Sequence, residues 1–319
     1  MGDSLYVSLF LLYGYIALGI IIGTFFKSYL KKLNSFFTEI LIKIISPLQV
    51  FISLTTTDFA LDFQFIIQIA LMAIGSFTFL AGSSYFFLKK RKIENGKLGS
   101  YILMNSMPNV LFYTIPIVLA VFNEGLTIVV VFFASIMLII RGTVMTYICE
   151  RLGADIKPDW KATLKNLITF IPFDAVIAGL IVLSFQMPMP IEIFNLIKPT
   201  VNTIATGFSA VLVGMIISGI SWIEIKNYWL DIKIVALWRF GLSLVFFMPI
   251  VYFLSFSMYQ SEIRSILLII MMGPPAILSV AFAVHFHLEE KFAAIAVATV
   301  TLFALTLLPL LVYIGKLMF

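Results

Sequence analysis

The sequence is poor in charge and in chemically reactive side chains. Only 12% of its 319 residues are Asp, Glu, Lys or Arg, and it contains one cysteine and two histidines. The single cysteine, Cys149, excludes a disulfide within the chain. The sequence has no P-loop, HExxH motif, CxxC pair or Asp-rich prenyl-diphosphate motif. We therefore expect no enzyme active site, no metal site and no cofactor.

Apolar residues dominate instead. They make up 61% of the chain, and the mean hydropathy is +1.09. A segment of about 20 apolar residues is long enough to cross the hydrocarbon core of a bilayer as a helix. The N-terminal letters MGDS carry no positive charge cluster, so we expect the first apolar run to be a span rather than a signal peptide. The sequence predicts an all-α polytopic membrane protein with ten transmembrane helices, at about 5–26, 34–56, 63–88, 99–122, 125–149, 167–186, 193–220, 231–256, 262–287 and 291–317.

Basic residues are distributed unevenly between these ten runs. Fifteen of the 21 Lys and Arg residues lie in, or at the edge of, the loops that follow odd-numbered runs. Cytoplasmic loops of membrane proteins carry such an excess. The pattern predicts a multi-pass protein of the cell membrane with Lys89–Lys92 in the cytoplasm and both termini outside. The net charge of +5 is thereby explained by topology, and we expect no nucleic-acid partner.

The polar stretch at residues 150–166 separates five runs from five runs. We expect it to be a cytoplasmic linker between a first repeat, residues 1–149, and a second repeat, residues 167–319. An odd number of spans in each half gives the two halves opposite orientations in the membrane, as in transporters with inverted repeats. The fourth run contains NSMPNVLFYTIP, from Asn105 to Pro116, and the ninth contains GPP, from Gly273 to Pro275. Paired interruptions in corresponding segments predict two broken helices that cross at a binding site.

The prolines indicate what this site offers. Pro108 has no amide hydrogen, so the carbonyl of Met104 loses its helical partner, and Pro274 and Pro275 do the same to the carbonyls of Ile270 and Met271. Free carbonyls in hydrocarbon are costly unless they line a cavity or meet a polar group. The half-helix after each break also presents free amides at its positive end. Ordinary kinks are the alternative explanation.

Candidate site residues follow from these breaks and from polar side chains in other runs. The candidate substrate-binding residues are Asn105, Ser106, Pro108, Asn109, Pro274, Pro275 and Ser279, with Gln49, Asn202 and Thr206 from the second and seventh runs.

Ionisable residues inside a membrane span suggest function, because each is costly unless paired or hydrated. Asp174 could carry a coupling proton, or pair with Lys43. Arg141 and Arg239 could each bind a carboxylate, since a guanidinium suits such groups. The alternative for both arginines is that they extend to lipid phosphates at the cytoplasmic surface.

Four segments resemble the auxin efflux carrier family, which includes prokaryotic members and the plant PIN proteins. They are PLQVFISL, SMPNVLFYTIPIVLAVF, GFSAVLVGMIISG and the stretch that begins GPPAILSVAFAVHFHLEEK. The resemblance implies a scaffold of helices 1, 2, 6 and 7 that often dimerises, and a transport domain of helices 3–5 and 8–10. It implies organic anions as substrates, auxin or dicarboxylates among them, and a site at Asn105, Pro108, Asn109, Pro274 and Pro275. The bile-acid sodium symporters are related in fold.

We therefore expect a secondary transporter of a small organic anion that works by alternating access, in the lipid bilayer, as a homodimer. With no ATP site, coupling would come from H⁺, from Na⁺ or from the gradient of the substrate. The alternatives are a sodium-coupled symporter of the bile-acid type and a channel or receptor of the same fold. A membrane enzyme would need paired carboxylates, histidine clusters or a nucleophile at depth, which the sequence hardly offers.

Overall fold

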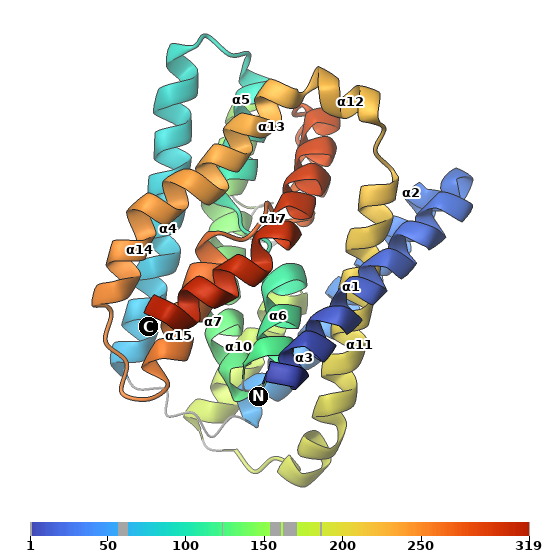
Figure 1. Ribbon diagram of the computed structural model, residues 1–319. Coiled ribbons are helices and arrows are strands. Elements are labelled where there is room, and N and C mark those ends of the chain that lie inside the picture. Colours follow the sequence, from blue (N-terminus) through green and yellow to red (C-terminus); the bar gives the residue numbers. More distant parts are fainter. Residues whose placement is uncertain are drawn as a thin grey trace. The chain divides into compact units, whose positions relative to one another are not determined.

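The computed structural model describes residues 2–56, 63–122, 124–153, 161, 171–185 and 187–318 (Figure 1). Where they are described, all ten apolar ranges expected from the sequence contain helix, with non-helical residues inside the fourth and the ninth, and an all-α protein is confirmed for this part of the chain. Most of the expected linker at 150–166, and the first residues of the sixth range, lie outside the described residues.

The chain forms two compact units, each assembled from separate stretches of sequence. Unit 1 comprises Met1–Leu61, Leu111–Ser135 and Asn166–Gly219, and unit 2 comprises Asp62–Val110, Ile136–Lys165 and Ile220–Phe319. The main helices of unit 1 are α1 (Gly2–Phe25), α2 (Leu30–Ile40), α3 (Ser46–Thr55), α6 (Ile115–Val121), α10 (Ile171–Ser184) and α11 (Ile191–Ser218). Those of unit 2 are α4 (Phe63–Lys90), α5 (Asn95–Ser106), α8 (Thr146–Leu152), α12 (Trp222–Asn227), α13 (Trp229–Ala236), α14 (Ser243–Phe253), α15 (Gln260–Met271), α16 (Leu278–His285) and α17 (Glu290–Met318). Helix α7 (Thr127–Ile140) passes from unit 1 into unit 2.

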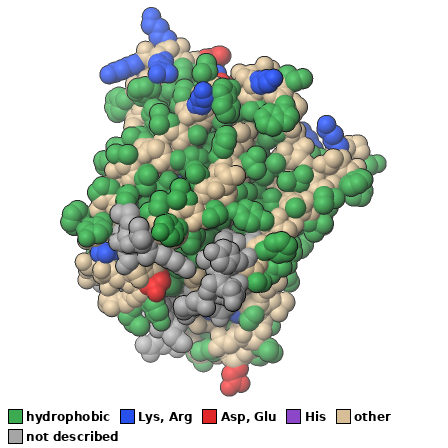
Figure 2. Space-filling model, viewed as in Figure 1, with side chains coloured by type: hydrophobic (Ala, Val, Ile, Leu, Met, Phe, Trp, Pro, Cys, Tyr) green, Lys and Arg blue, Asp and Glu red, His purple; other side chains and the backbone are tan. Residues whose placement is uncertain are grey.

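Six helical segments of the described chain are long and apolar enough to cross a membrane. They are Lys27–Thr55, Gln64–Lys90, Thr127–Leu152, Ile191–Ser218, Trp229–Phe253 and Glu290–Gly315. Their surfaces expose many large apolar side chains, among them Leu196, Val245 and Phe253, each at least 74% exposed. Hydrophobic side chains cover much of the visible face in Figure 2. A soluble protein rarely exposes so much apolar surface, so lipid is the solvent that fits this exterior.

In unit 1, α1 and α11 touch backbone to backbone. A Cβ atom placed on Gly214 would lie 2.1 Å from the carbonyl oxygen of Ile16, and one on Gly19 would lie 2.1 Å from that of Val211. Small residues allow membrane helices to approach in this way, because close van der Waals packing holds such helices together in lipid. Helix α3 packs against both α10 and α11.

In unit 2, α5 packs against α4 and α17, and α15 packs against α14 and α17. Helices α13 and α14 form one rod with a π-helical turn, Leu237–Leu242, between them (Figure 1). Further π-helical turns lie at Leu41–Ile45, Val110–Thr114 and Arg141–Met145. The three basic residues that the sequence places inside spans, Lys43, Arg141 and Arg239, all lie in such turns. Turns of this kind are often found at functional sites.

Candidate functional site

Two helices of unit 2 end where their extended continuations cross. Helix α5 ends at Ser106 and α15 at Met271. Beyond these ends, Pro108 and Pro275 face each other in an isolated antiparallel bridge. The interruptions that the sequence predicts in the fourth and ninth ranges are therefore present.

Two backbone hydrogen bonds hold the crossing together. The amide of Asn109 donates to the carbonyl of Pro274, and the amide of Ala276 donates to the carbonyl of Met107, each at 2.8 Å. The extended conformation has a local cause, since a residue before proline avoids the helical region, as Met107 does before Pro108. Each segment thus gives the other a partner that its own helix no longer supplies.

Arg239 fills the space between the two helix ends. Its side chain is fully buried, with 0% exposure. Nε donates to the carbonyl of Gly273 at 2.7 Å and Nη1 to that of Asn105 at 3.1 Å. Nη2 donates to the carbonyls of Met271 at 3.0 Å and Ile270 at 3.5 Å.

These contacts show which side chain binds the carbonyls that the prolines leave without helical partners. The carbonyls of Ile270 and Met271 are the two that Pro274 and Pro275 deprive of helical partners, and Arg239 binds both. For Arg239, the alternative that it extends to lipid phosphates is wrong, because its guanidinium lies inside unit 2 on backbone oxygens. Four of its five N–H groups are engaged there, which leaves little capacity for a substrate carboxylate.

Other polar side chains near the crossing are buried without a hydrogen-bond partner among the described residues. They include Nδ2 of Asn109 and Oγ of Ser279, at 2% and 0% exposure. Asn105 donates from Nδ2 to Oγ of Ser84 at 2.9 Å, but its Oδ1 has no such partner. Ser106 differs, because its hydroxyl donates to the carbonyl of Ile102 in its own helix at 2.7 Å. The crossing therefore retains unused donors and one unused acceptor.

Arg141 adds a cation next to one of these elements. It is 7% exposed, and its Nε has no hydrogen-bond partner in the described structure. Its guanidinium lies 5.8 Å from the ring centre of Phe282 on α16, the helix that begins beside the crossing and carries Ser279. Of the two arginines that the sequence offers as anion contacts, Arg141 is the one whose Nε is buried without a partner among the described residues.

Three of the candidate substrate-binding residues lie in unit 1. Gln49 on α3 donates from Nε2 to Oδ1 of Asn202 on α11 at 3.1 Å, and Nδ2 of Asn202 has no partner among the described residues. A cavity of about 300 Å³ opens beside Asn202, with Thr206, Tyr15 and Pro116 also in its lining. The sequence thus identifies residues that gather in unit 1, while the proline-linked set gathers in unit 2.

Of the two alternatives for Asp174, the pairing with Lys43 is wrong. Lys43 instead forms an exposed ion pair with Glu39 at 2.9 Å, one helical turn away. Asp174 lies in the first described turn of α10 with its side chain exposed. Its role as a proton carrier stays a prediction.

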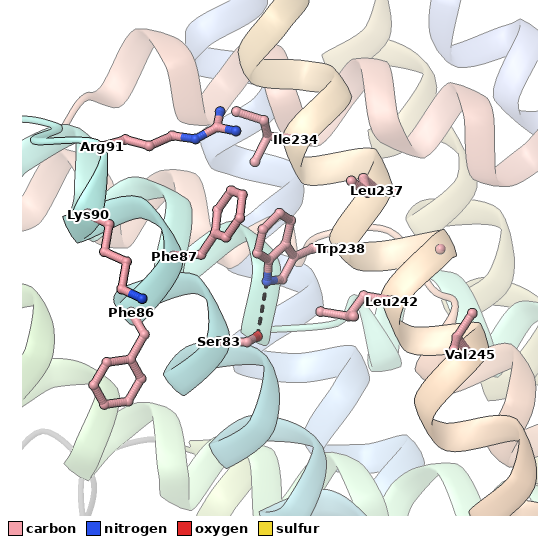
Figure 3. Close-up of a pocket in the computed structure, with 11 residues that line it drawn as sticks. Ser83, Phe86, Phe87, Lys90, Arg91, Ile234, Leu237, Trp238, Leu242 and Val245 are labelled. Atoms are coloured by element: carbon pink, nitrogen blue, oxygen red, sulfur yellow. Dashed lines mark hydrogen bonds between the residues drawn. The ribbon is translucent and has the colours of Figure 1, made fainter.

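A larger hollow on unit 2 has a different character. It measures about 710 Å³ and lies between α4 and the rod of α13 and α14. Most of its lining is apolar, and Ser83, Lys90 and Arg91 also belong to it (Figure 3). Its lining includes Phe86 and Val245, at 70% and 74% exposure. The indole N–H of Trp238 donates to Oγ of Ser83 at 3.1 Å, so this donor is already engaged by the protein. An open apolar groove of this kind suits hydrocarbon chains rather than a small polar solute.

Sequence reasoning missed a polar cluster at the first turns of α5. Lys97 pairs with Asp231 of α13 at 2.9 Å, and the hydroxyl of Tyr101 donates to the same carboxylate. It also missed Ser84, which receives the Asn105 amide. The sequence indicates Ser84 only as one of two adjacent serines, Ser83 and Ser84, in an apolar run, and this pattern does not predict which residue they bond.

Neither the family models nor the curated proteins compared with this chain match it.

Proposed function

We propose that this protein is a secondary transporter of a small organic anion across the cell membrane, with its site at the crossing of the two broken helices. The proposal includes ten spans in two inverted repeats, both termini outside, and a homodimer. The resemblance of the four sequence segments to auxin efflux carriers supports the anion as the substrate class.

One observation carries the proposal. Nδ2 of Asn109, Oγ of Ser279 and Nε of Arg141 are buried polar groups with no partner among the described residues. A buried donor without an acceptor costs about 1–3 kcal/mol, so three of them in one unit favour a ligand that supplies acceptors. A carboxylate supplies two acceptor oxygens and a charge opposite to that of Arg141.

Transport rather than catalysis fits the remaining chemistry of unit 2. No group of three or more His, Cys, Asp or Glu side chains able to hold a metal occurs among the described residues. The site consists of backbone, amides, hydroxyls and guanidinium groups, which bind and orient an anion without breaking bonds in it. Broken helices that cross in this way place ligands in transporters whose two parts move against each other.

The experiment measures binding of small mono- and dicarboxylates to the purified protein by thermal shift, followed by uptake into vesicles. We expect at least one carboxylate to raise the melting temperature. Asn109→Ala and Arg141→Gln should each weaken its binding by about five- to a hundred-fold, which corresponds to ~1–3 kcal/mol for a lost buried polar contact.

Thr301→Val is the matched control. Thr301 is also buried in unit 2, but its hydroxyl donates to the carbonyl of Val297 in its own helix at 2.6 Å. This variant should bind the carboxylate as the unsubstituted protein does. The proposal is wrong if no carboxylate stabilises the protein, or if the Asn109 and Arg141 variants bind as tightly as the control. Electrical recordings distinguish a carrier from a channel, since the transport rate of a carrier is slow and saturates with substrate concentration.

A further inference from the structure

The surroundings of Arg239 are those of a bound cation. Four backbone carbonyls face its guanidinium, from Asn105 on one side of the crossing and from Ile270, Met271 and Gly273 on the other. Both α5 and α15 direct their C-terminal ends, the negative ends of their helix dipoles, at this point. No described acidic side chain forms an ion pair with Arg239. Oxygen atoms of the backbone, and not a carboxylate, therefore balance its charge.

Unwound carbonyls and the C-terminal ends of half-helices are also the groups that coordinate inorganic coupling cations in transporters with broken helices. Here a side chain of the protein occupies such a cage. We infer that Arg239 is a tethered cation that closes the crossing and takes the place of a free metal ion, so that transport of the anion does not require sodium. The statement about transport rests on the proposed function, whereas the statement about the cage does not.

The guanidinium suits this position better than an ammonium group. Its planar fork lets Nε, Nη1 and Nη2 reach carbonyls on two different chain segments at once, whereas the ammonium of lysine is a single point charge. The turn that carries Arg239 is itself held in place. Its neighbour Trp238 bonds through the indole to Ser83, and the carbonyl of Trp238 accepts from Oγ of Ser243 at 3.0 Å. These two hydrogen bonds hold the turn that carries Arg239 in place, while the guanidinium contacts both chain segments of the crossing.

The first experiment removes the tethered cation and offers a free one. Arg239→Ala should lower the melting temperature by several degrees, because it removes the donors to the buried carbonyls of Asn105, Met271 and Gly273. The carbonyl of Ile270 still accepts from the amide of Gly273 at 3.1 Å. Millimolar guanidinium should restore a substantial part of the loss, whereas potassium and urea at the same concentrations should not. Arg239→Lys should lie between the two proteins in stability and should gain nothing from guanidinium, since its own ammonium occupies the space.

Arg264→Ala is the matched control. Arg264 also donates to a backbone carbonyl, that of Leu254, from Nε at 3.0 Å, but it is only partly buried and lies outside the crossing. Guanidinium should not stabilise this variant. Equal rescue of both alanine variants, or an Arg239→Ala variant as stable as the unsubstituted protein, would overturn the inference about the cage. If Arg239→Ala yields no folded protein, Arg239→Lys provides the test, and a lysine variant as stable as the unsubstituted protein would overturn the inference about the cage.

The second experiment replaces sodium by choline at constant ionic strength. We expect the unsubstituted protein to keep its melting temperature, its carboxylate affinity and its uptake rate. A sodium-specific stabilisation or an uptake that requires sodium would refute the tethered-cation inference while leaving an anion transporter in place. Failure of the proposed function has another signature, because then no carboxylate binds, although guanidinium still rescues Arg239→Ala.

Discussion

Two groups of buried polar side chains differ in whether their polar atoms have a hydrogen-bond partner. The hydroxyls of Ser106, Ser135 and Thr301 donate to carbonyls of their own helices and need no other partner. Asn109 and Ser279 hold buried polar atoms with no partner in the described structure. An unpaired buried group costs ~1–3 kcal/mol, so the second group lowers the stability of the protein unless a ligand supplies the missing partners.

One exposed carboxylate gives a pH dependence that can be predicted with its sign. Glu224 closes a capping box at the start of α12, where it accepts from the backbone N–H of Ser221 at 3.2 Å and from its hydroxyl at 3.0 Å. These two donors, with Lys291 at 3.3 Å, hold the pKa of Glu224 below its usual value. A carboxylate with a lowered pKa stabilises the folded state above its unfolded pKa, about 4.3, and loses this effect as the pH falls through the folded value.

Glu224→Gln keeps an acceptor for the capping box and removes the charge. We expect the variant to melt at a lower temperature than the unsubstituted protein at neutral pH. The difference between the two melting temperatures should disappear as the pH falls below the pKa of an ordinary glutamate. Melting temperatures of both proteins from neutral to acid pH measure this. A gap that stays constant over the whole range would show that the charge of Glu224 contributes nothing.

The sequence predicts some features at this scale and not others. The loss of helical partners for the carbonyls of Ile270 and Met271 follows from two prolines four residues further on, which is a local rule. Their new partner, Arg239, is more than 30 residues away, and nothing in its sequence neighbours points to them. Lys43 shows the opposite case. Its partner Glu39 lies four residues earlier, at helical spacing, whereas the alternative drawn from the sequence is the distant Asp174.

At the scale of helices, apolar run length predicts position well. The third range was expected at 63–88 and the helix is Phe63–Lys90, because the polar residues around it mark both ends. The π-helical turns could not be predicted, since an extra residue in one turn leaves no mark on a hydrophobic run. Two of these turns carry Arg141 and Arg239. The direction in which these buried cations point therefore depends on a feature that the sequence does not predict.

The contact of α1 with α11 gives a prediction about helix packing. Gly214→Ala would place a methyl group 2.1 Å from the carbonyl oxygen of Ile16, so the helices must separate. Overpacking of this kind typically costs ~1–3 kcal/mol, and we expect a clearly lower melting temperature. Gly207→Ala, seven residues earlier on the same helix, is the control.

A methyl group at Gly207 would meet the ring of Tyr15 at 3.7 Å, which is ordinary contact. The Gly207 variant should therefore match the unsubstituted protein, or exceed it because alanine is the better helix former. Equal melting temperatures for the two alanine variants would show that α1 and α11 do not rely on close backbone approach.

At the scale of the whole molecule, the halves of the sequence and the compact units do not coincide. The halves, 1–149 and 167–319, follow from counting apolar runs, whereas each unit takes stretches from both halves. The second and seventh ranges fall in unit 1, the third and ninth in unit 2, and the fourth and fifth are divided between the units. Run counting cannot assign a helix to a unit, because the assignment depends on which surfaces pack together.

The two short bonds at the crossing also have a consequence for how fast its backbone amides exchange with deuterium. Asn109 and Ala276 lie outside any helix, yet their amides are hydrogen-bonded at 2.8 Å, and both residues are at most 4% exposed. Amides held in this way exchange only when the surrounding structure opens. We expect both to exchange as slowly as the amides in the middle of α5, although residues in a simple proline kink would exchange rapidly.

Mass spectrometry of peptides that cover residues 105–112 and 272–279 would measure this. Rapid labelling of both peptides would mean that the crossing opens freely and acts as a joint. Slow labelling would mean that the prolines do not create a hinge, and that α5, α15 and α16 keep their mutual positions at the crossing while any large motion takes place elsewhere.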